Sequence, residues 1–318
     1  MPNGVVVITG PTATGKTRLG VMLSQRLGGE VVSADSMQLY RYMDIGTAKP
    51  AEGEMEGVPH HMLDVAEPWE AYSVSRYVDE AAACIDDILA RGRLPLIVGG
   101  TGLYIDSLLS GRSFMGGDAE LRERFSKEYD SEGGERMLMR LAEVDPASAQ
   151  RLHANDKKRI IRALEVFYAT GKTITEHNIE TQKLPPRYEY CKIALSFEDR
   201  AELYRHIDRR VDLMMESGLL EEVKGLVQMG LDGGSTAMQA IGYKELYLSV
   251  NGGCTVEQAV EQIKQSSRRY AKRQLSWLSG KRDVNWILWK NERNFDRACQ
   301  ISTNFVENNG IITEADKK

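Results

Sequence analysis

Residues 10–17 form the segment that most restricts what this chain can fold into. They read Gly-Pro-Thr-Ala-Thr-Gly-Lys-Thr, which matches the phosphate-binding pattern GxxxxGK(S/T). A β-branched apolar run at 5–8 precedes the loop, and a helical pattern starts at Lys16. A strand that turns through glycines into a helix directs backbone amides at an anion. The sequence therefore predicts an α/β fold that binds two linked phosphates after its first strand.

The residue types of this loop suit a diphosphate. Its glycines let the backbone wrap the phosphates, Lys16 supplies a positive charge, and the Thr17 hydroxyl is a candidate ligand for Mg²⁺. The predicted diphosphate-binding residues are Gly10, Thr12, Ala13, Thr14, Gly15, Lys16 and Thr17. Such loops are typical of nucleotide and ATP binding, but the loop does not say what carries the phosphates.

The composition is that of a globular protein. Of 318 residues, 42% are hydrophobic and 27% are charged, and the formal net charge is −5 at pH 7. This length allows one large core plus a smaller unit, and the net charge restricts any RNA-binding surface to a local patch. The four cysteines have no CxxC spacing, so no zinc site is predicted. With no signal-like or membrane-length apolar segment, we expect a cytoplasmic monomer without membrane association.

Strand and helix patterns alternate in the first 112 residues. Strands are predicted at 5–9, 30–34 and 94–98, and helices at 16–27, 75–91 and 103–109. This alternation predicts a P-loop NTPase-like parallel sheet with helices on both faces. Ligands of such sheets bind at the carboxyl ends of the strands, so Thr9, Ala34 and Val98 should end at one cleft.

The pattern changes after Arg112. Residues 113–189 contain short amphipathic helical segments and no predicted strand, and Asp145-Pro146 is a helix start. We therefore predict an all-helical insertion domain at 113–189 within a core formed by 1–112 and 190–318.

The last third returns to the core. A strand is predicted at 190–195, followed by long helices, one of which opens at a Thr255 capping box and runs to about residue 278. A late strand at 284–288 and a polar tail complete the prediction.

Asp35-Ser36-Met37-Gln38 follows the second predicted strand. An aspartate at this position can act as a general base or a metal partner, or can simply cap its own turn. Because it should share a cleft with the phosphate loop, both interpretations stay open.

Gly99-Gly100-Thr101-Gly102 lies where many P-loop NTPases carry a magnesium-associated aspartate. Here the next carboxylate is Asp106, which argues against ATP hydrolysis. Thr101 can cap the following helix, contact a ligand, or do both.

His60 and His61 are adjacent, so their rings point in different directions. We predict structural hydrogen bonds for both and no metal pair.

Three sets of basic residues stand out against the acidic background. An arginine of the helix that carries Arg205, Arg209 and Arg210 could neutralise a departing diphosphate. Two further clusters can be solvated faces or an RNA backbone track: Lys157-Lys158-Arg159 with Arg162, and Arg268-Arg269 with Lys272-Arg273.

In combination, these motifs resemble the tRNA dimethylallyltransferases, also called tRNA isopentenyltransferases. The resemblance spans nearly the whole chain. It rests on 10–17, 35–38 with Tyr40, 43–50 (Met-Asp-Ile-Gly-Thr-Ala-Lys-Pro), 59–61, 98–104, 162–166, Gly242-Tyr243 and 270–274.

The resemblance implies transfer of a dimethylallyl group from dimethylallyl diphosphate to the exocyclic amine of the adenosine 3′ of the tRNA anticodon. Asp35 would accept the amine proton, Thr101 would contact the diphosphate bridge or the adenine, and Arg210 would contact the diphosphate, with Arg209 as its adjacent alternative. Mg²⁺ on Thr17 would be the cofactor.

The resemblance also implies contacts with the tRNA anticodon stem-loop. The residues concerned are Asp35, Ser36, Met37, Gln38, Thr101, Arg122, Lys158, Arg159, Arg162, Gln239, Gly242, Tyr243, Lys244, Arg269, Lys272 and Arg273.

Three other functions remain open from the residues alone. A small-molecule P-loop kinase would transfer phosphate from ATP. A non-catalytic RNA-binding P-loop protein would tolerate loss of Asp35. A transferase acting on free adenine nucleotides would have no use for the insertion and the two basic clusters.

Overall fold

The computed structural model describes residue 2 and residues 4–111, 117–290 and 292–312. Contacts divide the chain into two compact units, one formed by Met1–Leu109 with Tyr188–Lys318 and the other by Ser110–Arg187. The boundary predicted between residues 112 and 113 falls outside the described residues.

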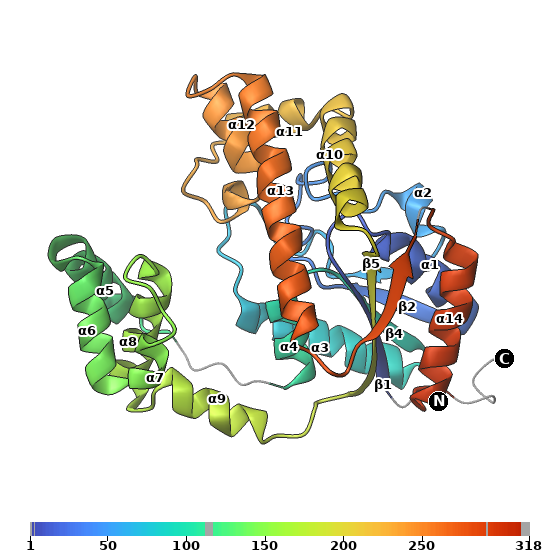
Figure 1. Ribbon diagram of the computed structural model, residues 1–318, viewed down its shortest axis with the longest axis horizontal. Coiled ribbons are helices and arrows are strands. Elements are labelled where there is room, and N and C mark those ends of the chain that lie inside the picture. The colour runs from blue at the N-terminus through green and yellow to red at the C-terminus, as the bar shows by residue number, and fades with distance from the viewer. Residues whose placement is uncertain (1, 3, 112–116, 291, 313–318) are drawn as a thin grey trace. The chain divides into compact units, whose positions relative to one another are not determined.

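The larger unit contains a sheet that is six-stranded over the described residues, and all its strand pairs are parallel. The strand order is β3-β2-β4-β1-β5-β6 (Figure 1). The strands are β1 (Gly4–Thr9), β2 (Gly29–Ser33), β3 (His60–His61), β4 (Leu94–Val98), β5 (Glu189–Phe197) and β6 (Asn285–Trp289). The predicted parallel sheet is confirmed.

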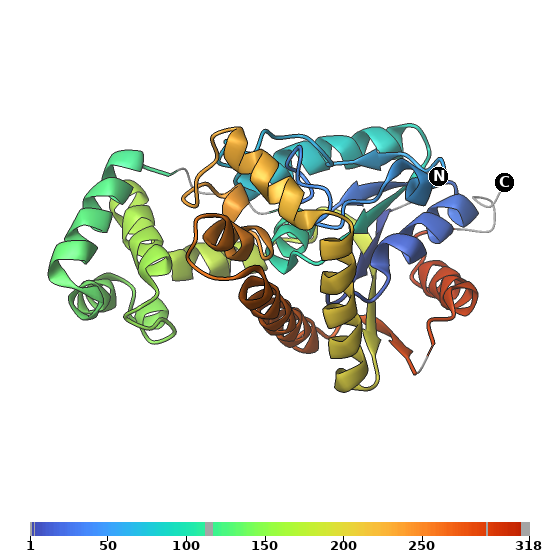
Figure 2. The same ribbon diagram turned by 90° about the horizontal axis from the view of Figure 1, so that it is seen from above.

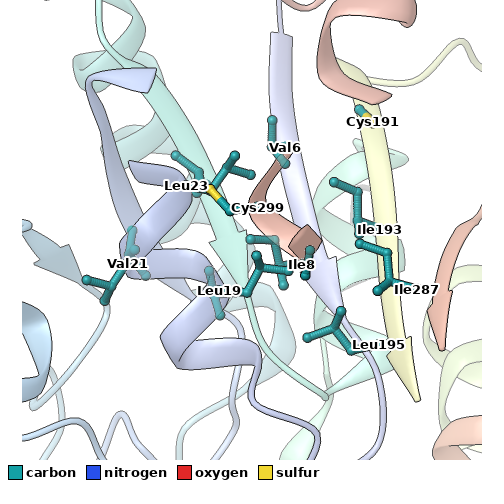
Figure 3. Close-up of a cluster of buried hydrophobic side chains, with 14 of the residues drawn as sticks. Val6, Ile8, Leu19, Val21, Leu23, Cys191, Ile193, Leu195, Ile287 and Cys299 are labelled. Atoms are coloured by element: carbon teal, nitrogen blue, oxygen red, sulfur yellow. The ribbon is translucent and has the colours of Figure 1, made fainter. Parts of the chain in front are cut away.

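The central strands are apolar because both faces of the sheet are covered. In Figures 1 and 2, α3 (Val74–Ala90) lies on one face, and α1 (Lys16–Leu27) and α14 (Phe295–Asn308) lie on the other. Figure 3 shows part of the core on the second face, where side chains of β1, β5, α1 and α14 gather. This core fixes the start of α1, and with it the phosphate loop.

The other helices of the larger unit follow the sheet strands or precede β6. They are α2 (Glu52–Met55), α4 (Gly102–Leu109), α10 (Arg200–Glu216), α11 (Leu219–Gln228), η1 (Ala237–Gln239), α12 (Tyr243–Val250) and α13 (Val256–Ser279). As predicted, Thr255 caps α13 in a capping box with Gln258.

The prediction of a polar tail after the last strand is wrong. Helix α14 occupies this segment and buries Ala298, Cys299 and Val306 in the core. Phe295, Ile301 and Phe305 also pack against this core, so apolar residues recur at helical spacing through the segment and the sequence carries a helical signal that the prediction missed. The short elements β3 and α2 were also not predicted.

The smaller unit is helical throughout its described residues. Its helices are α5 (Ala119–Glu132), α6 (Gly134–Val144), α7 (Pro146–Ala149), α8 (Lys157–Thr170) and α9 (Ile174–Gln182). Phe125, Leu141 and Leu164 are fully buried in its own core. The predicted start of α7 is confirmed, since the Asp145 carboxylate accepts a hydrogen bond of 3.0 Å from the Ser148 amide.

Over the part of the chain that the structure describes, every helix is too short or too polar to cross a membrane.

Candidate active site

A cavity of about 820 Å³ opens at the carboxyl ends of β1, β2 and β4. Residues that follow each of these strands line it, among them Thr12, Asp35 and Gly100. A second cavity of about 270 Å³ shares Thr12, Asp35, Arg210 and Tyr270 with the first. The predicted convergence of three strand ends is confirmed.

The phosphate loop contains two glycines, and its backbone requires both of them. Gly10 has φ +135°, and a Cβ there would lie 2.2 Å from the Leu195 carbonyl oxygen. Gly15 has φ +89° and precedes α1. Such backbone conformations are accessible to glycine at little cost. The loop can therefore direct its amides into the cavity.

Lys16 lies at the N-terminus of α1 and lines the large cavity. Its Nζ donates a hydrogen bond of 2.8 Å to the Pro11 carbonyl. Burial and the neighbouring Arg210 lower the pKa of Lys16 to about 7, against the opposing effect of Asp35. Lys16, Arg210 and Asp35 therefore interact electrostatically within one site.

The side chains of this site are compatible with a divalent cation that takes most of its ligands from phosphate oxygens and water. The described residues contain no group of three His, Cys, Asp or Glu residues that could hold a metal. Asp106, the first carboxylate after β4, instead accepts hydrogen bonds of 2.8 Å from Trp277 and Lys281. Thr17 lines the cavity, and a hydroxyl oxygen is a ligand type that Mg²⁺ accepts beside phosphates and water.

Asp35 faces both cavities and also caps its own turn. Its Oδ1 accepts a hydrogen bond of 2.9 Å from the Met37 amide. The Thr101 hydroxyl accepts one of 3.1 Å from the Ser36 amide, and the Thr101 amide donates to the Ala34 carbonyl at 3.1 Å. Asp35 can therefore cap its own turn and still face a ligand in the cavities. The turn after β4 supports the turn after β2 through Thr101.

Two different close contacts explain the paired glycines. A Cβ at Gly99 would lie 2.2 Å from the Ala34 carbonyl oxygen. A Cβ at Gly100 would lie 2.2 Å from Nε2 of Gln274. A side chain at 99 would separate the two turns, and one at 100 would displace Gln274 of α13.

Gln274 is a site residue to which the sequence assigned no role. From α13, its Oε1 accepts a hydrogen bond of 3.0 Å from the Thr12 amide, and its Nε2 donates one of 3.0 Å to the Gly100 carbonyl. The side chain is only 5% exposed. Gln274 therefore ties the phosphate loop to the turn after β4. Its sequence signal was its place in the 270–274 segment, on which the family resemblance partly rests.

Arg209 and Arg210 both line the large cavity, but they differ in position. Arg209 is exposed, whereas Arg210 also lines the second cavity. Burial lowers the pKa of Arg210, and Asp35 opposes that shift. Arg210 is therefore the arginine that lies beside Asp35 and Lys16. Arg205 points elsewhere and pairs with Glu202.

The end of β6 and the segment that follows it also contribute to the site. Nε1 of Trp289 donates a hydrogen bond of 2.9 Å to the Thr14 carbonyl, and Arg293 lines the large cavity. The Phe295 ring packs so closely that a Cβ on Gly15 would lie 2.6 Å from it. The predicted polar tail therefore supports the phosphate loop.

The segment 44–50 is anchored from α11 and α12. One oxygen of Glu222 accepts hydrogen bonds from the Asp44 and Ile45 amides at 2.9 and 2.8 Å, and the other accepts one of 2.6 Å from the Tyr243 hydroxyl. Lys49 pairs with Asp44 at 2.6 Å. These contacts fix a loop that lines both cavities.

A family model described as IPP transferase matches residues 38–282, and one described as isopentenyl transferase matches residues 3–67. The chain belongs to the IPP transferase family.

Relatives and solved structures agree with this assignment. The tRNA dimethylallyltransferase of Acetivibrio thermocellus is 45% identical over 304 residues, which cover 95% of this chain and 96% of the relative. That of Bacillus cytotoxicus is 51% identical over 285 residues, 89% of each protein.

The structure of the Bacillus halodurans tRNA isopentenylpyrophosphate transferase matches with a TM-score of 0.72 at 39% identity. The match covers 97% of this chain and 98% of that chain. A eukaryotic dimethylallyltransferase acting on tRNA matches with a TM-score of 0.81 at 31% identity, over 98% of this chain and 81% of its own.

In this family member, the basic residues of α13 separate into two groups. Arg269, Lys272 and Arg273 are exposed, and Arg273 lies over the Tyr270 ring at 5.5 Å. Arg268 instead pairs with Asp208 of α10 at 2.6 Å. Of the four cations in this cluster, Arg268 is therefore set apart as a partly buried residue that pairs with α10.

The other residues expected to bind tRNA are placed as follows. Ser36, Met37, Gln239 and Gly242 line the second cavity, and Lys244 is exposed. The Gln38 amide donates hydrogen bonds to the carbonyls of Thr47 and Ala48 at 3.2 and 3.1 Å. Tyr243 is fully buried. The side chains of Gln38 and Tyr243 thus support the 44–50 segment.

In the smaller unit, Lys158 and Arg159 are exposed on α8. Arg122 and Arg162 both pair with Glu165, at 2.8 and 3.0 Å.

The two histidines make structural hydrogen bonds, as predicted. Nδ1 of His60 bonds to the Val58 carbonyl, and Nε2 of His61 bonds to the Glu30 carboxylate, each at 2.8 Å.

Proposed function

We propose that this protein transfers the dimethylallyl group of dimethylallyl diphosphate to the exocyclic amine of the adenosine 3′ of the anticodon in tRNA. The observation that carries the proposal is the placement of Asp35. It lies at the boundary of two cavities, with the phosphate loop, Lys16 and Arg210 lining the larger one. This arrangement can hold the leaving diphosphate in the larger cavity and the attacking amine next to Asp35.

The diphosphate end of the reaction depends on positive charge. As the carbon–oxygen bond breaks, negative charge grows on the departing oxygen. Lys16, Arg210 and the amides of the loop stabilise this charge more in the transition state than in the ground state. Bound Mg²⁺, with Thr17 as its protein ligand, would neutralise further charge on the diphosphate.

The acceptor end depends on position and on proton removal. An aromatic amine is a weak nucleophile, so alignment of its nitrogen with the allylic carbon supplies much of the rate. A carbon–nitrogen bond forms, the carbon–oxygen bond breaks, and the Asp35 carboxylate accepts the amine proton. Thr101 holds the turn that carries Asp35.

Exposed cations hold the tRNA. Its target adenosine leaves the base stack of the anticodon loop to enter the cavity. Unstacking costs a few kcal/mol, which contacts with the RNA backbone offset. We assign these contacts to the residues expected from the family. On α13 they are Arg269, Lys272 and Arg273, and in the helical unit they are Arg122, Lys158, Arg159 and Arg162.

The test is label transfer from dimethylallyl diphosphate to RNA. We expect label in an unmodified tRNA that has adenosine 3′ of the anticodon, in the presence of Mg²⁺ and without ATP. The matched substrate with guanosine at that position should stay unlabelled. Absence of label from all adenosine-containing anticodon loops, or phosphate transfer from ATP to a small acceptor, would reject the proposal.

A further inference from the structure

We propose that Glu165 is a positioning residue for RNA binding, which acts by holding Arg122 and Arg162 in one fixed arrangement. The inference rests on the proposed function, because it assigns those arginines to the tRNA backbone. Glu165 itself contacts no RNA in this proposal.

The geometry around Glu165 is that of a buried acceptor with two charged donors. Glu165 lies on α8, and its side chain is 0% exposed. Its Oε1 accepts from Nη2 of Arg122 at 2.8 Å, and its Oε2 accepts from Nε of Arg122 at 3.2 Å. Nη1 of Arg162 lies 3.0 Å from Oε1. One carboxylate thus connects an arginine of α5 with one of α8.

The backbone before α5 closes the same arrangement. The Asp118 amide donates a hydrogen bond of 2.9 Å to Oε1 of Glu165. A Cβ on Gly117 would lie 2.6 Å from Nη2 of Arg122 and 3.0 Å from Oε1 of Glu165. Both oxygens of the carboxylate therefore have donors, and the approach of the chain leaves no room for a side chain at 117.

Arg122, Arg162 and Glu165 carry one net positive charge between them. Burial alone raises the pKa of Glu165, but hydrogen bonds from Arg122 and the charge of Arg162 outweigh it and hold the pKa below its usual value. Two guanidinium groups surround one carboxylate. The side chains of Arg122 and Arg162 remain 56% and 35% exposed. Both arginines therefore reach solvent while their inner edges are fixed by Glu165.

Fixed arginines bind RNA phosphates at a lower entropic cost. A free arginine loses rotamer freedom when it binds a phosphate, and pre-ordering removes part of that loss. Bidentate geometry also matches guanidinium groups to phosphate oxygens. Glu165 orders Arg122 through such a contact and aligns Arg162 beside it.

Simple electrostatics predicts the opposite sign for the loss of Glu165. If the carboxylate acted only as a negative charge near RNA, its neutralisation would strengthen RNA binding. If it positions the two arginines, neutralisation weakens binding. The direction of the change separates the two accounts.

The experiment measures binding of an unmodified anticodon stem-loop RNA by fluorescence anisotropy with the full chain. We expect Glu165→Gln to weaken binding about fivefold. It should also raise KM for tRNA, with kcat and KM for dimethylallyl diphosphate unchanged. The matched control is Glu128→Gln, which removes a carboxylate of the same unit that pairs with Arg140 at 2.6 Å. It should leave binding unchanged or slightly tighter.

A double-mutant comparison tests the route of the effect. In an Arg122→Ala, Arg162→Ala background, Glu165→Gln should cause no further loss of affinity, because its effect passes through those side chains. If thermal unfolding shows that Glu165→Gln disrupts the helical unit, Arg122→Lys serves instead. It keeps the charge and loses the bidentate contact, and it should weaken binding by a similar factor.

Equal or tighter RNA binding by a folded Glu165→Gln protein, or an undiminished loss in the double-alanine background, would overturn the inference while leaving the proposed function intact. Failure of the wild-type chain to bind the stem-loop would instead reject the proposed function, and the inference with it.

Discussion

The Ser36 amide donates a hydrogen bond of 3.1 Å to the Thr101 hydroxyl, which joins the turn that follows β2 to the turn that follows β4. Asp35 is the neighbour of Ser36, so its position depends on this bond. Thr101→Val keeps the shape of the side chain and removes the acceptor. We expect kcat to fall about ten- to a hundredfold as Asp35 is displaced.

Thr101→Ser is the control for that prediction, since it retains the hydroxyl and should keep most of the activity. Steady-state kinetics at saturating substrates measures both variants. Full activity of Thr101→Val would show that Asp35 does not depend on this bond.

Asp35→Asn should lower kcat by about two orders of magnitude or more, because the amide cannot accept the amine proton. Binding of inorganic diphosphate should persist, since Lys16 and the loop remain. Single-turnover transfer and a separate diphosphate titration check the two halves of this prediction. Normal transfer at saturation would leave Asp35 with its turn-capping role alone.

Lys16 gives a pH dependence with a defined sign. Burial and Arg210 lower its pKa to about 7, below the value of about 10.4 in an unfolded chain. Between these two pH values the unfolded chain binds more protons at this residue, so the contribution of Lys16 makes stability rise with pH.

Bound diphosphate favours the charged lysine, so binding at about pH 8 should take up a proton.

Calorimetry in buffers of different ionisation enthalpy measures that proton uptake. Lys16→Arg is the matched control, because arginine stays protonated and should bind diphosphate without the lysine's share of the uptake. Equal proton uptake by the two proteins would contradict a lowered pKa at Lys16.

Gln274→Met should weaken both the fold and the diphosphate site. It leaves the Thr12 amide and the Gly100 carbonyl without this partner, at a cost of ~1–3 kcal/mol for each group that stays buried. We expect a lower melting temperature and a higher KM for dimethylallyl diphosphate. Gln265→Met, at an exposed position of the same helix, should change neither. An unchanged KM would show that the loop keeps its shape without Gln274.

Arg269→Ala and Arg273→Ala should each weaken tRNA binding and reduce the slope of log affinity against log salt by about one. Arg268→Ala is the control on the same helix. Its guanidinium already pairs with Asp208, so the expected effect is on stability and not on the slope. Equal slopes for all variants and the wild type would show that the exposed cations of α13 face solvent and do not bind tRNA.

The sequence predicted the elements on either side of the phosphate loop. The run at 5–8 and the helix from Lys16 follow from local pattern, and so does the convergence of three strand ends. The choice between Arg209 and Arg210 required the rotation of α10, which Leu203, Ile207 and Val211 set by packing into the core.

Contacts between distant segments were not predictable from pattern. Gln274 and Glu222 accept hydrogen bonds from backbone amides of segments that are far away in the sequence. Every residue except proline has such an amide, so the residue type at the donor position does not reveal the contact. The same holds for Arg268, whose pairing with Asp208 depends on how α10 and α13 pack.

The bond between Trp289 and Thr14 has a consequence for the order of assembly. A ribosome synthesises the phosphate loop first and the segment around Trp289 only after most of the chain. Closure over such a separation is slow compared with the formation of local helices. A nascent chain that ends before Trp289 therefore has a phosphate loop without this hydrogen bond, and the loop acquires it only when nearly the whole chain has been made.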